Sequence, residues 1–144
     1  MSTVKLKKGY DVPLLGEASG EIADAKPAKS GAIKPSEFRG IKPKLLVSQG
    51  DNVKCGSPLF CSKKNSEHLF TSPVSGVVES IQRGSKRVIE HIIIAPDGRN
   101  EAVEFKRYSK DQLVSLGRTE VLNQLQKSGM LAIFRQRPFN NVAD

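Results

Sequence analysis

Between Val47 and Val78 the chain alternates short apolar runs with turn-forming residues, and no helical spacing of apolar positions is present there. Glycine accepts positive φ and proline fixes φ for a turn, and the residues that mark the turns are Gly50, Gly56, Pro58, Pro73 and Gly76. A looser copy of strand, turn and strand follows at residues 77–95. The pattern predicts a flattened β-barrel in which small antiparallel sheets fold over one thin core.

The segment before the barrel is predicted to be extended. Residues 4–15 combine a short alternating strand with a glycine turn and Pro13. In residues 18–34, Pro27 and the following Pro35 exclude long helices, because proline lacks an amide hydrogen and restricts the residue before it. This stretch is either two edge strands or an arm that wraps around the barrel.

The pattern changes after the barrel. A last strand is predicted at residues 102–108, followed by a short helix that starts near Ser109 and ends at Gly117. A second helix is predicted from an N-cap at Thr119 to a stop at Gly129, because apolar residues recur on one face between them.

Residues 130–144 are predicted to form a helix or an extended segment that runs into a polar tail, with no element that would seal the core. This indicates the N-terminal piece of a longer protein. The expected organisation is N-terminal strands and a basic extended arm at 1–39, a barrel at 40–108, and a helical segment at 109–144 that leads into a further C-terminal part. The fold class is mainly β with two C-terminal helices (α+β).

Positive charge is concentrated in one span of the chain. The formal net charge is +8, and residues 26–64 contain nine lysines and arginines against two acidic residues, Glu37 and Asp51. Nucleic-acid modules interleave such charge with stacking aromatic residues, but this span has only Phe38 and Phe60. This argues against nucleic acid and leaves two interpretations open, docking on a partner or phospholipid surface and simple solvation.

Residues with catalytic or metal-binding chemistry occur singly. Cys55 and Cys61 are too far apart for a C-x-x-C pair, and His68 and His91 stand alone in strand-like surroundings. We therefore predict no catalytic residue and no metal site. No apolar run approaches the roughly 20 residues of a membrane span, and the N-terminus lacks a secretory signal, so the prediction is a cytoplasmic protein.

Two motifs resemble the barrel-sandwich hybrid of lipoyl and biotinyl carrier domains: GDNVKCG at residues 50–56 and SPVSG at residues 72–76. Carrier domains present a modified lysine on the hairpin ahead of the second motif. Lys63 and Lys64 lie near that tip, but the position eight residues before Pro73 is Asn65, and the usual residues flanking the lysine are missing. A lipoyl- or biotin-type carrier is the alternative hypothesis.

Three further segments together resemble the A subunit of the bacterial Na+-translocating NADH:quinone reductase family, namely KKGYDVPL at 7–14, RGSKRV at 83–88 and SGMLAIFRQRPF at 128–139. The resemblance runs nearly end to end and implies the N-terminal portion of that polypeptide. The resemblance implies a subunit of a translocase that couples electron transfer from NADH to ubiquinone with Na+ export. The isolated fragment is expected to be inactive.

The resemblance also implies partners. A protein of this kind is peripheral, has no transmembrane segment, and lies on the cytoplasmic face of the bacterial inner membrane, where it docks on a membrane subunit. We expect the basic span to supply the docking surface through Lys42, Lys44, Lys54, Lys63 and Lys64.

No cofactor is expected on this chain. The related Rnf subunit and the flavin subunit of complex I hold FMN on a glycine-rich loop, whereas here Leu131, Ile133, Phe134 and Arg135 stand at the comparable place. In the implied complex FAD, FMN, riboflavin and iron–sulfur centres belong to other subunits, and ubiquinone is a candidate ligand of the full-length protein only.

The carrier hypothesis predicts a fixed increase in the intact mass of natively expressed protein, from lipoate or biotin on Lys63 or Lys64. The reductase hypothesis predicts the unmodified mass. Mass spectrometry of the native protein separates them, and an unmodified mass eliminates the carrier.

Overall fold

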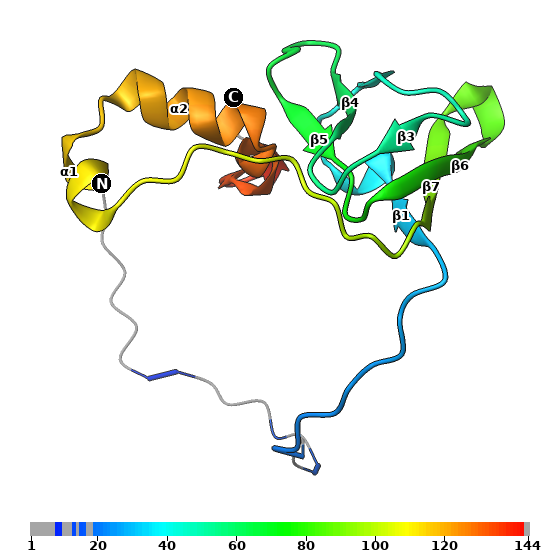
Figure 1. The fold of residues 1–144 in the computed structure, drawn as a ribbon, viewed down its shortest axis with the longest axis horizontal. Coiled ribbons are helices and arrows are strands. Elements are labelled where there is room, and N and C mark those ends of the chain that lie inside the picture. The colour runs from blue at the N-terminus through cyan, green and yellow to red at the C-terminus, as the bar shows by residue number, and fades with distance from the viewer. Residues whose placement is uncertain (1–7, 10–12, 14, 17–18, 143–144) are drawn as a thin grey trace.

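The predicted strands and turns form two antiparallel sheets that face each other (Figure 1). The computed structural model describes residues 8–9, 13, 15–16 and 19–142, so the strand predicted at residues 4–15 lies largely outside the described residues. The first sheet has the order β1-β7-β6-β3 and contains β1 (Gly31–Ile33), β3 (Asn52–Val53), β6 (Gly76–Arg83) and β7 (Ile89–Pro96). The second has the order β2-β4-β5 and contains β2 (Pro43–Leu45), β4 (Pro58–Ser62) and β5 (Leu69–Thr71).

The glycine and proline motifs act as turns, as predicted. Gly50 has a φ of 93°, and its N–H donates to the carbonyl of Val78 at 2.8 Å, which ties the turn before β3 to β6. The next residue, Asp51, accepts the N–H of Ser48 on its carboxylate at 2.8 Å and closes the same turn. Short 3-10 turns are present at η1 (Pro35–Glu37) and at η2 (Ser85–Arg87), the latter between β6 and β7.

Gly76 starts β6 opposite Pro96, the last residue of β7. Its φ is 153°, and a Cβ there would lie 1.9 Å from the carbonyl oxygen of Ala95. Only glycine fits such an approach, which explains the glycine that ends the SPVSG motif.

A stack of aromatic rings fills the space beside the second sheet. Phe60 and Phe70 are opposite each other on β4 and β5, are 0% and 2% exposed, and stack with ring centroids 4.5 Å apart. Phe38, which follows η1, packs edge-on against Phe70 at 4.5 Å. The guanidinium of Arg135 lies over the ring of Phe38 at 5.5 Å, so the end of the chain is attached to this stack.

The strand predicted at residues 102–108 does not form. Ala102 makes a single parallel bridge with Cys55, after which the segment continues without regular structure. Within the described residues no strand lies beside residues 104–108, and the carbonyl of Lys106 instead accepts the side-chain amide of Gln124 on α2 at 3.1 Å. The segment therefore supports a helix instead of joining a sheet.

Both predicted helices are present as α1 (Lys110–Ser115) and α2 (Arg118–Lys127). Ser109 caps α1 in a capping box, in which its side chain accepts the N–H of Gln112 and the Gln112 side chain accepts the N–H of Ser109. The predicted N-cap Thr119 is wrong: Gly117 precedes the helix, and its carbonyl accepts the first helical bonds. Gly129, with a φ of 71°, ends the helical conformation after α2, as predicted.

The expectation that no terminal element seals the core is also wrong. After Gly129 the chain forms η3 (Met130–Ile133) and a small hairpin of β8 (Arg135–Gln136) and β9 (Asn141–Val142). Ala132 and Val142 are 5% and 4% exposed and belong to the core. Gly129 packs against β5 so closely that a Cβ would lie 2.9 Å from Thr71 Cγ2, and this close approach turns the chain back over the barrel.

The segment ahead of the barrel matches neither predicted alternative in full: among residues 19–34 one edge strand forms in place of two, and the arm does not wrap around the barrel. Residues 31–33 are an edge strand, because β1 pairs with β7. Residues 19–30 have no regular structure, are exposed, and run away from the barrel as an arm (Figure 1). Within the described part of the chain, no helix has the length and apolar character needed to cross a bilayer.

Gly76→Ala is expected to destabilise the protein by about 3 kcal/mol or more, because the new methyl group overlaps the backbone of Ala95. Urea unfolding measures the change. Gly20→Ala is the matched control, since no atom lies within 4 Å of the added Cβ, and it should leave the unfolding midpoint unchanged. A Gly76→Ala midpoint equal to that of the control contradicts the close approach.

Candidate functional site

Four of the five lysines predicted to form a docking surface gather at one end of the second sheet. Lys44 is on β2 opposite Cys61, and Lys42 precedes β2. The N–H of Lys63 donates to the carbonyl of Lys42 at 2.8 Å, so the end of β4 lies beside the start of β2. We call Lys42, Lys44, Lys63 and Lys64 the lysine surface, and all four are exposed.

The loop that carries Lys63 and Lys64 is ordered by two polar residues that sequence reasoning did not assign to the site. Asn65 accepts the N–H of Glu67 on its side-chain oxygen at 3.0 Å, and its amide contacts the ring nitrogen Nε2 of His68 at 3.2 Å. His68 is only 3% exposed, which fixes one end of the loop. The signal in the sequence was the N-x-x-H spacing beside the lysine pair, because Asn side chains commonly close such turns.

The lysine surface carries uncompensated positive charge. Within the residues that the structure describes, none of its four ammonium groups has a carboxylate within 4.0 Å. The acidic residue on the same loop, Glu67, instead accepts a hydrogen bond from Gln126 of α2 at 2.6 Å. Adjacent like charges repel one another, and an anionic partner would relieve this repulsion.

Lys54 does not belong to this surface. It lies ahead of β4, whereas Lys63 follows β4, so a five-residue strand with a rise of about 3.3 Å per residue separates them. The ammonium of Lys54 pairs with Glu101 Oε2 at 3.1 Å. Both side chains are about half exposed, so the pair adds little to stability, but it engages the charge that docking would use.

A second polar cluster closes the other end of the barrel. The Ser75 hydroxyl donates to Asp97 Oδ1 at 2.7 Å, and the N–H of Arg99 donates to the same oxygen at 2.9 Å. These two hydrogen bonds, the first being the stronger influence, hold the pKa of Asp97 below its ordinary value. Arg99 also approaches Glu101, so the cations and carboxylates of this cluster pair with one another. Its arrangement serves to hold the turns of the barrel together.

A third cluster attaches α2 to the segment that follows the barrel. The Tyr108 hydroxyl donates to Glu120 Oε1 at 2.8 Å, and the Lys106 ammonium donates to the same oxygen at 3.3 Å. The Tyr108 hydrogen bond, followed by that of Lys106, lowers the pKa of Glu120, and the hydrogen bond to Glu120 raises the pKa of Lys106. No periodic signal in the sequence marks this cluster, because its members come from two different elements.

The remaining residues considered in the sequence analysis are the two cysteines, the candidate metal ligands and the segment compared with an FMN-binding loop. Cys55 and Cys61 are free thiols, and the described residues contain no group of three His, Cys, Asp or Glu side chains arranged to hold a metal. The segment compared with an FMN loop forms η3 and β8, where Ile133 and Phe134 are exposed. A hollow of about 690 Å³ is lined by residues 102–107, which include three charged side chains.

The fold and the site define a class of protein. Two facing antiparallel sheets joined by glycine turns, with a lysine-bearing hairpin loop, are those of a barrel-sandwich hybrid domain. The family model described as NqrA N-terminal barrel-sandwich hybrid domain matches residues 4–97, and the chain belongs to that family.

Relatives that match almost the whole chain are named as the A subunit of the Na(+)-translocating NADH-quinone reductase. The one from Pseudomonas aeruginosa (strain UCBPP-PA14) is 41% identical over 141 residues, which cover 98% of this chain and 32% of the relative. The relative from Tolumonas auensis is 42% identical over 95% of this chain and 31% of its own length. The one from Neisseria meningitidis serogroup A is 39% identical over 96% and 31%. The chain spans about a third of the length of these relatives.

Tyr108→Phe is expected to raise the pKa of Glu120 toward its ordinary value of 4.5, because the carboxylate loses a donor that favours its charged form. A group with a lowered pKa stabilises the fold above its ordinary pKa, and this contribution is lost as the pH falls through the folded value. The attachment of α2 therefore weakens in acid.

The midpoint for Glu120 is read from its carboxyl carbon chemical shift in an NMR titration. The midpoint of Asp97 in the same spectra is the control and should not move, because Asp97 belongs to a separate cluster. An unchanged Glu120 midpoint in Tyr108→Phe contradicts the hydrogen bond.

Proposed function

We propose that this chain is the N-terminal domain of the A subunit in a Na+-translocating NADH:quinone reductase. Membership of the NqrA N-terminal family and the names of the relatives support this assignment. The enzyme couples electron transfer from NADH to ubiquinone with export of Na+. In this proposal the domain contributes no catalytic group, and activity belongs to the assembled complex.

The role proposed for the domain is docking on other subunits. The observation that carries it is the lysine surface, where four exposed lysines lie on β2, just before β2, and on the ordered loop that follows β4. An ordered array of cations loses less conformational entropy on binding than a flexible one, and it presents positive charge in a fixed pattern. Of the five residues predicted from sequence, Lys54 is left out because it already pairs with Glu101.

The partner proposed for the lysine surface is the acidic, lipid-rimmed surface of the membrane subunit, on the cytoplasmic face of the bacterial inner membrane. Each lysine near an anionic bilayer contributes about 1 kcal/mol before screening. The flavins and iron–sulfur centres are assigned to other subunits, and ubiquinone to the full-length protein. The proposal includes no cofactor on this domain.

Reversing two charges of the lysine surface, Lys44→Glu with Lys63→Glu, is expected to weaken assembly. Loss of two lysines at about 1 kcal/mol each corresponds to roughly 30-fold in affinity, and reversal adds repulsion. The measurement is the amount of the variant polypeptide retained when the complex is purified through a tag on another subunit, in a buffer of low salt.

The matched control is Lys26→Glu with Lys29→Glu, which makes the same change in net charge on the exposed arm. The control variant should assemble almost normally, apart from a small long-range effect that salt removes. Equal retention of wild type and Lys44→Glu/Lys63→Glu contradicts the proposal. Equal losses in the two double variants also contradict it, because net charge alone would then explain assembly.

A further inference from the structure

The two helices bury none of their residues. Neither α1, with six residues, nor α2, with ten, contains a buried side chain among the residues described. Helices shorter than about 12 residues are marginal in water, and in proteins they are stabilised mainly by packing an apolar face against another element. The capping box, the Glu120 cluster and the Glu67–Gln126 hydrogen bond position these helices, but all three lie on exposed surface.

Exposed large apolar side chains are more numerous in the segment that contains the helices and the C-terminal hairpin than in the barrel. In the described chain, eight exposed large apolar residues fall between 113 and 139, against three between 31 and 96. We define the C-terminal face by the six that are most exposed: Leu113, Val114, Met130, Ile133, Phe134 and Phe139, at 55%, 90%, 44%, 65%, 53% and 71%.

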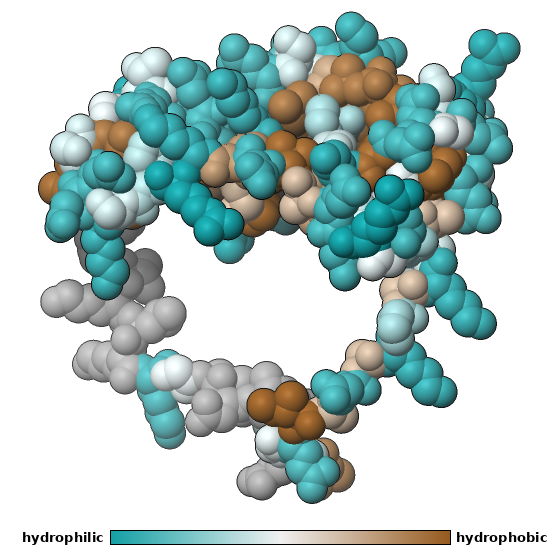
Figure 2. All heavy atoms as spheres, in the orientation of Figure 1, coloured by the Kyte–Doolittle hydropathy of each residue, from teal (hydrophilic) through white to brown (hydrophobic). Residues whose placement is uncertain are grey.

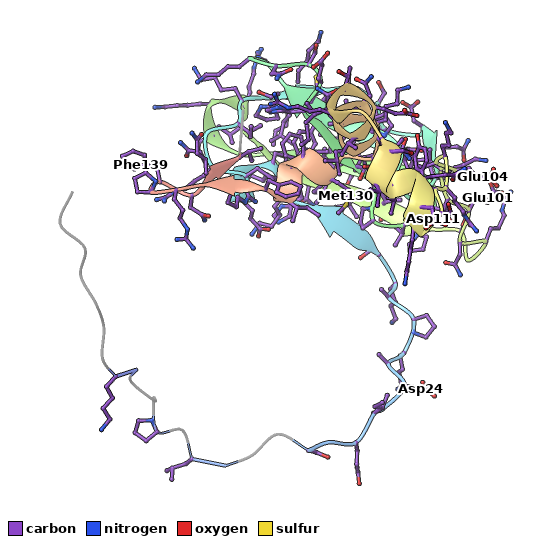
Figure 3. The ribbon with its side chains drawn as sticks, turned by 90° about the vertical axis from the view of Figure 1, so that its left-hand side faces the viewer. Asp24, Glu101, Glu104, Asp111, Met130 and Phe139 are labelled. Carbon is purple, nitrogen blue, oxygen red and sulfur yellow. The ribbon has the colours of Figure 1, made fainter. Side chains whose placement is uncertain are left out.

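Two of these residues, Met130 and Phe139, are labelled in Figure 3. Met130 lies at the start of η3, near the centre of the view, and Phe139 lies at the tip of the β8–β9 hairpin and points away from the body. Figure 2 shows a few apolar side chains exposed among polar ones at the end of the molecule that α1 forms. Met130, Ile133 and Phe134 lie together on η3 and its C-cap, and grouped exposed apolar residues mark interaction surfaces more often than isolated ones do.

The length of the relatives says what covers this face. The match to the Pseudomonas aeruginosa relative spans 98% of this chain, so the C-terminal face lies inside the shared third, and about two thirds of the relative lies outside it. We infer that the C-terminal face is the docking surface for that remaining part of the full-length protein, within one polypeptide. A domain boundary of this kind normally buries the apolar residues that an isolated domain leaves exposed.

The charges around the face define the chemistry of its occupant. Between residues 109 and 142 the chain has five basic residues and two acidic ones, and Glu120, one of the two, is already engaged by Tyr108 and Lys106. The buried Nη1 of Arg135 finds no hydrogen-bond acceptor among the described residues. The occupant therefore presents apolar side chains to the six residues and carboxylates or carbonyl oxygens to the surrounding cations.

This inference rests on family membership and on the C-terminal face, and it makes no use of the lysine surface. A docking defect on the membrane and a defect in packing inside one polypeptide are measured separately. Failure of one proposal therefore leaves the other standing.

Amide hydrogen exchange tests the inference. The first sample is the 144-residue chain. The second is the full-length Pseudomonas aeruginosa relative, with its matching third replaced by this chain. In the 144-residue chain at low concentration, α1 and α2 should exchange fast while β6 and β7 are protected; in the full-length protein, protection of α1 and α2 should rise at least tenfold. Protection of β6 and β7 reports that the barrel is folded in both samples.

Ile133→Glu in the full-length protein should return α1 and α2 to fast exchange, because a buried carboxylate opposes docking. Val88→Glu is the matched control, since Val88 is 54% exposed at the β6–β7 turn, away from the face, and it should leave exchange unchanged. Equal protection of the two helices in the 144-residue chain and in the full-length protein overturns the inference. Protection that increases with the concentration of the isolated chain also overturns it, because the occupant would then be a second copy.

Discussion

The aromatic stack of Phe38, Phe60 and Phe70 is the constraint on which the rest of the structure depends. Phe60 and Phe70 fix the register of β4 against β5, and Phe38 brings the segment before β2 onto the same stack. Arg135 then lies over Phe38, so the end of the chain is held by the same group of rings. Removing a buried phenylalanine from such a site typically costs about 3–5 kcal/mol, and here it would loosen three segments together.

This packing connects the two surfaces for which we propose a role. The loop after β4 carries Lys63 and Lys64 of the lysine surface, and Glu67 of that loop accepts a hydrogen bond from Gln126 of α2. The C-terminal face continues from α2 through η3 to the hairpin that Arg135 anchors. The charged surface that we propose for another subunit and the apolar surface that we propose for the rest of the same polypeptide are thus joined through one small domain. Membership of the NqrA N-terminal barrel-sandwich hybrid family is consistent with a domain that positions other domains and subunits.

Much of the fold follows from residues whose effect is local. Gly50 and Gly76 need backbone conformations that favour glycine, so their turns were predictable from sequence, as was the helix capped by Ser109. Long-range contacts were not predictable. The segment at 102–108 has a strand-like pattern but serves as an acceptor for Gln124, and the two-residue strands β8 and β9 are too short to show periodicity. Of the site, the lysines were found from charge alone, whereas the separation of Lys54 from the others depends on which end of β4 each residue occupies.

The most direct test of the central claim is lysine footprinting with a small acetylating reagent, read by mass spectrometry, on the free chain and on the assembled membrane complex. We predict that Lys42, Lys44, Lys63 and Lys64 react readily in the free chain and lose reactivity together in the complex, while Lys26 and Lys29 on the arm do not lose it. Undiminished reactivity of the four lysines in the complex would contradict the account, because a docking surface cannot remain open to the reagent when its partner is bound.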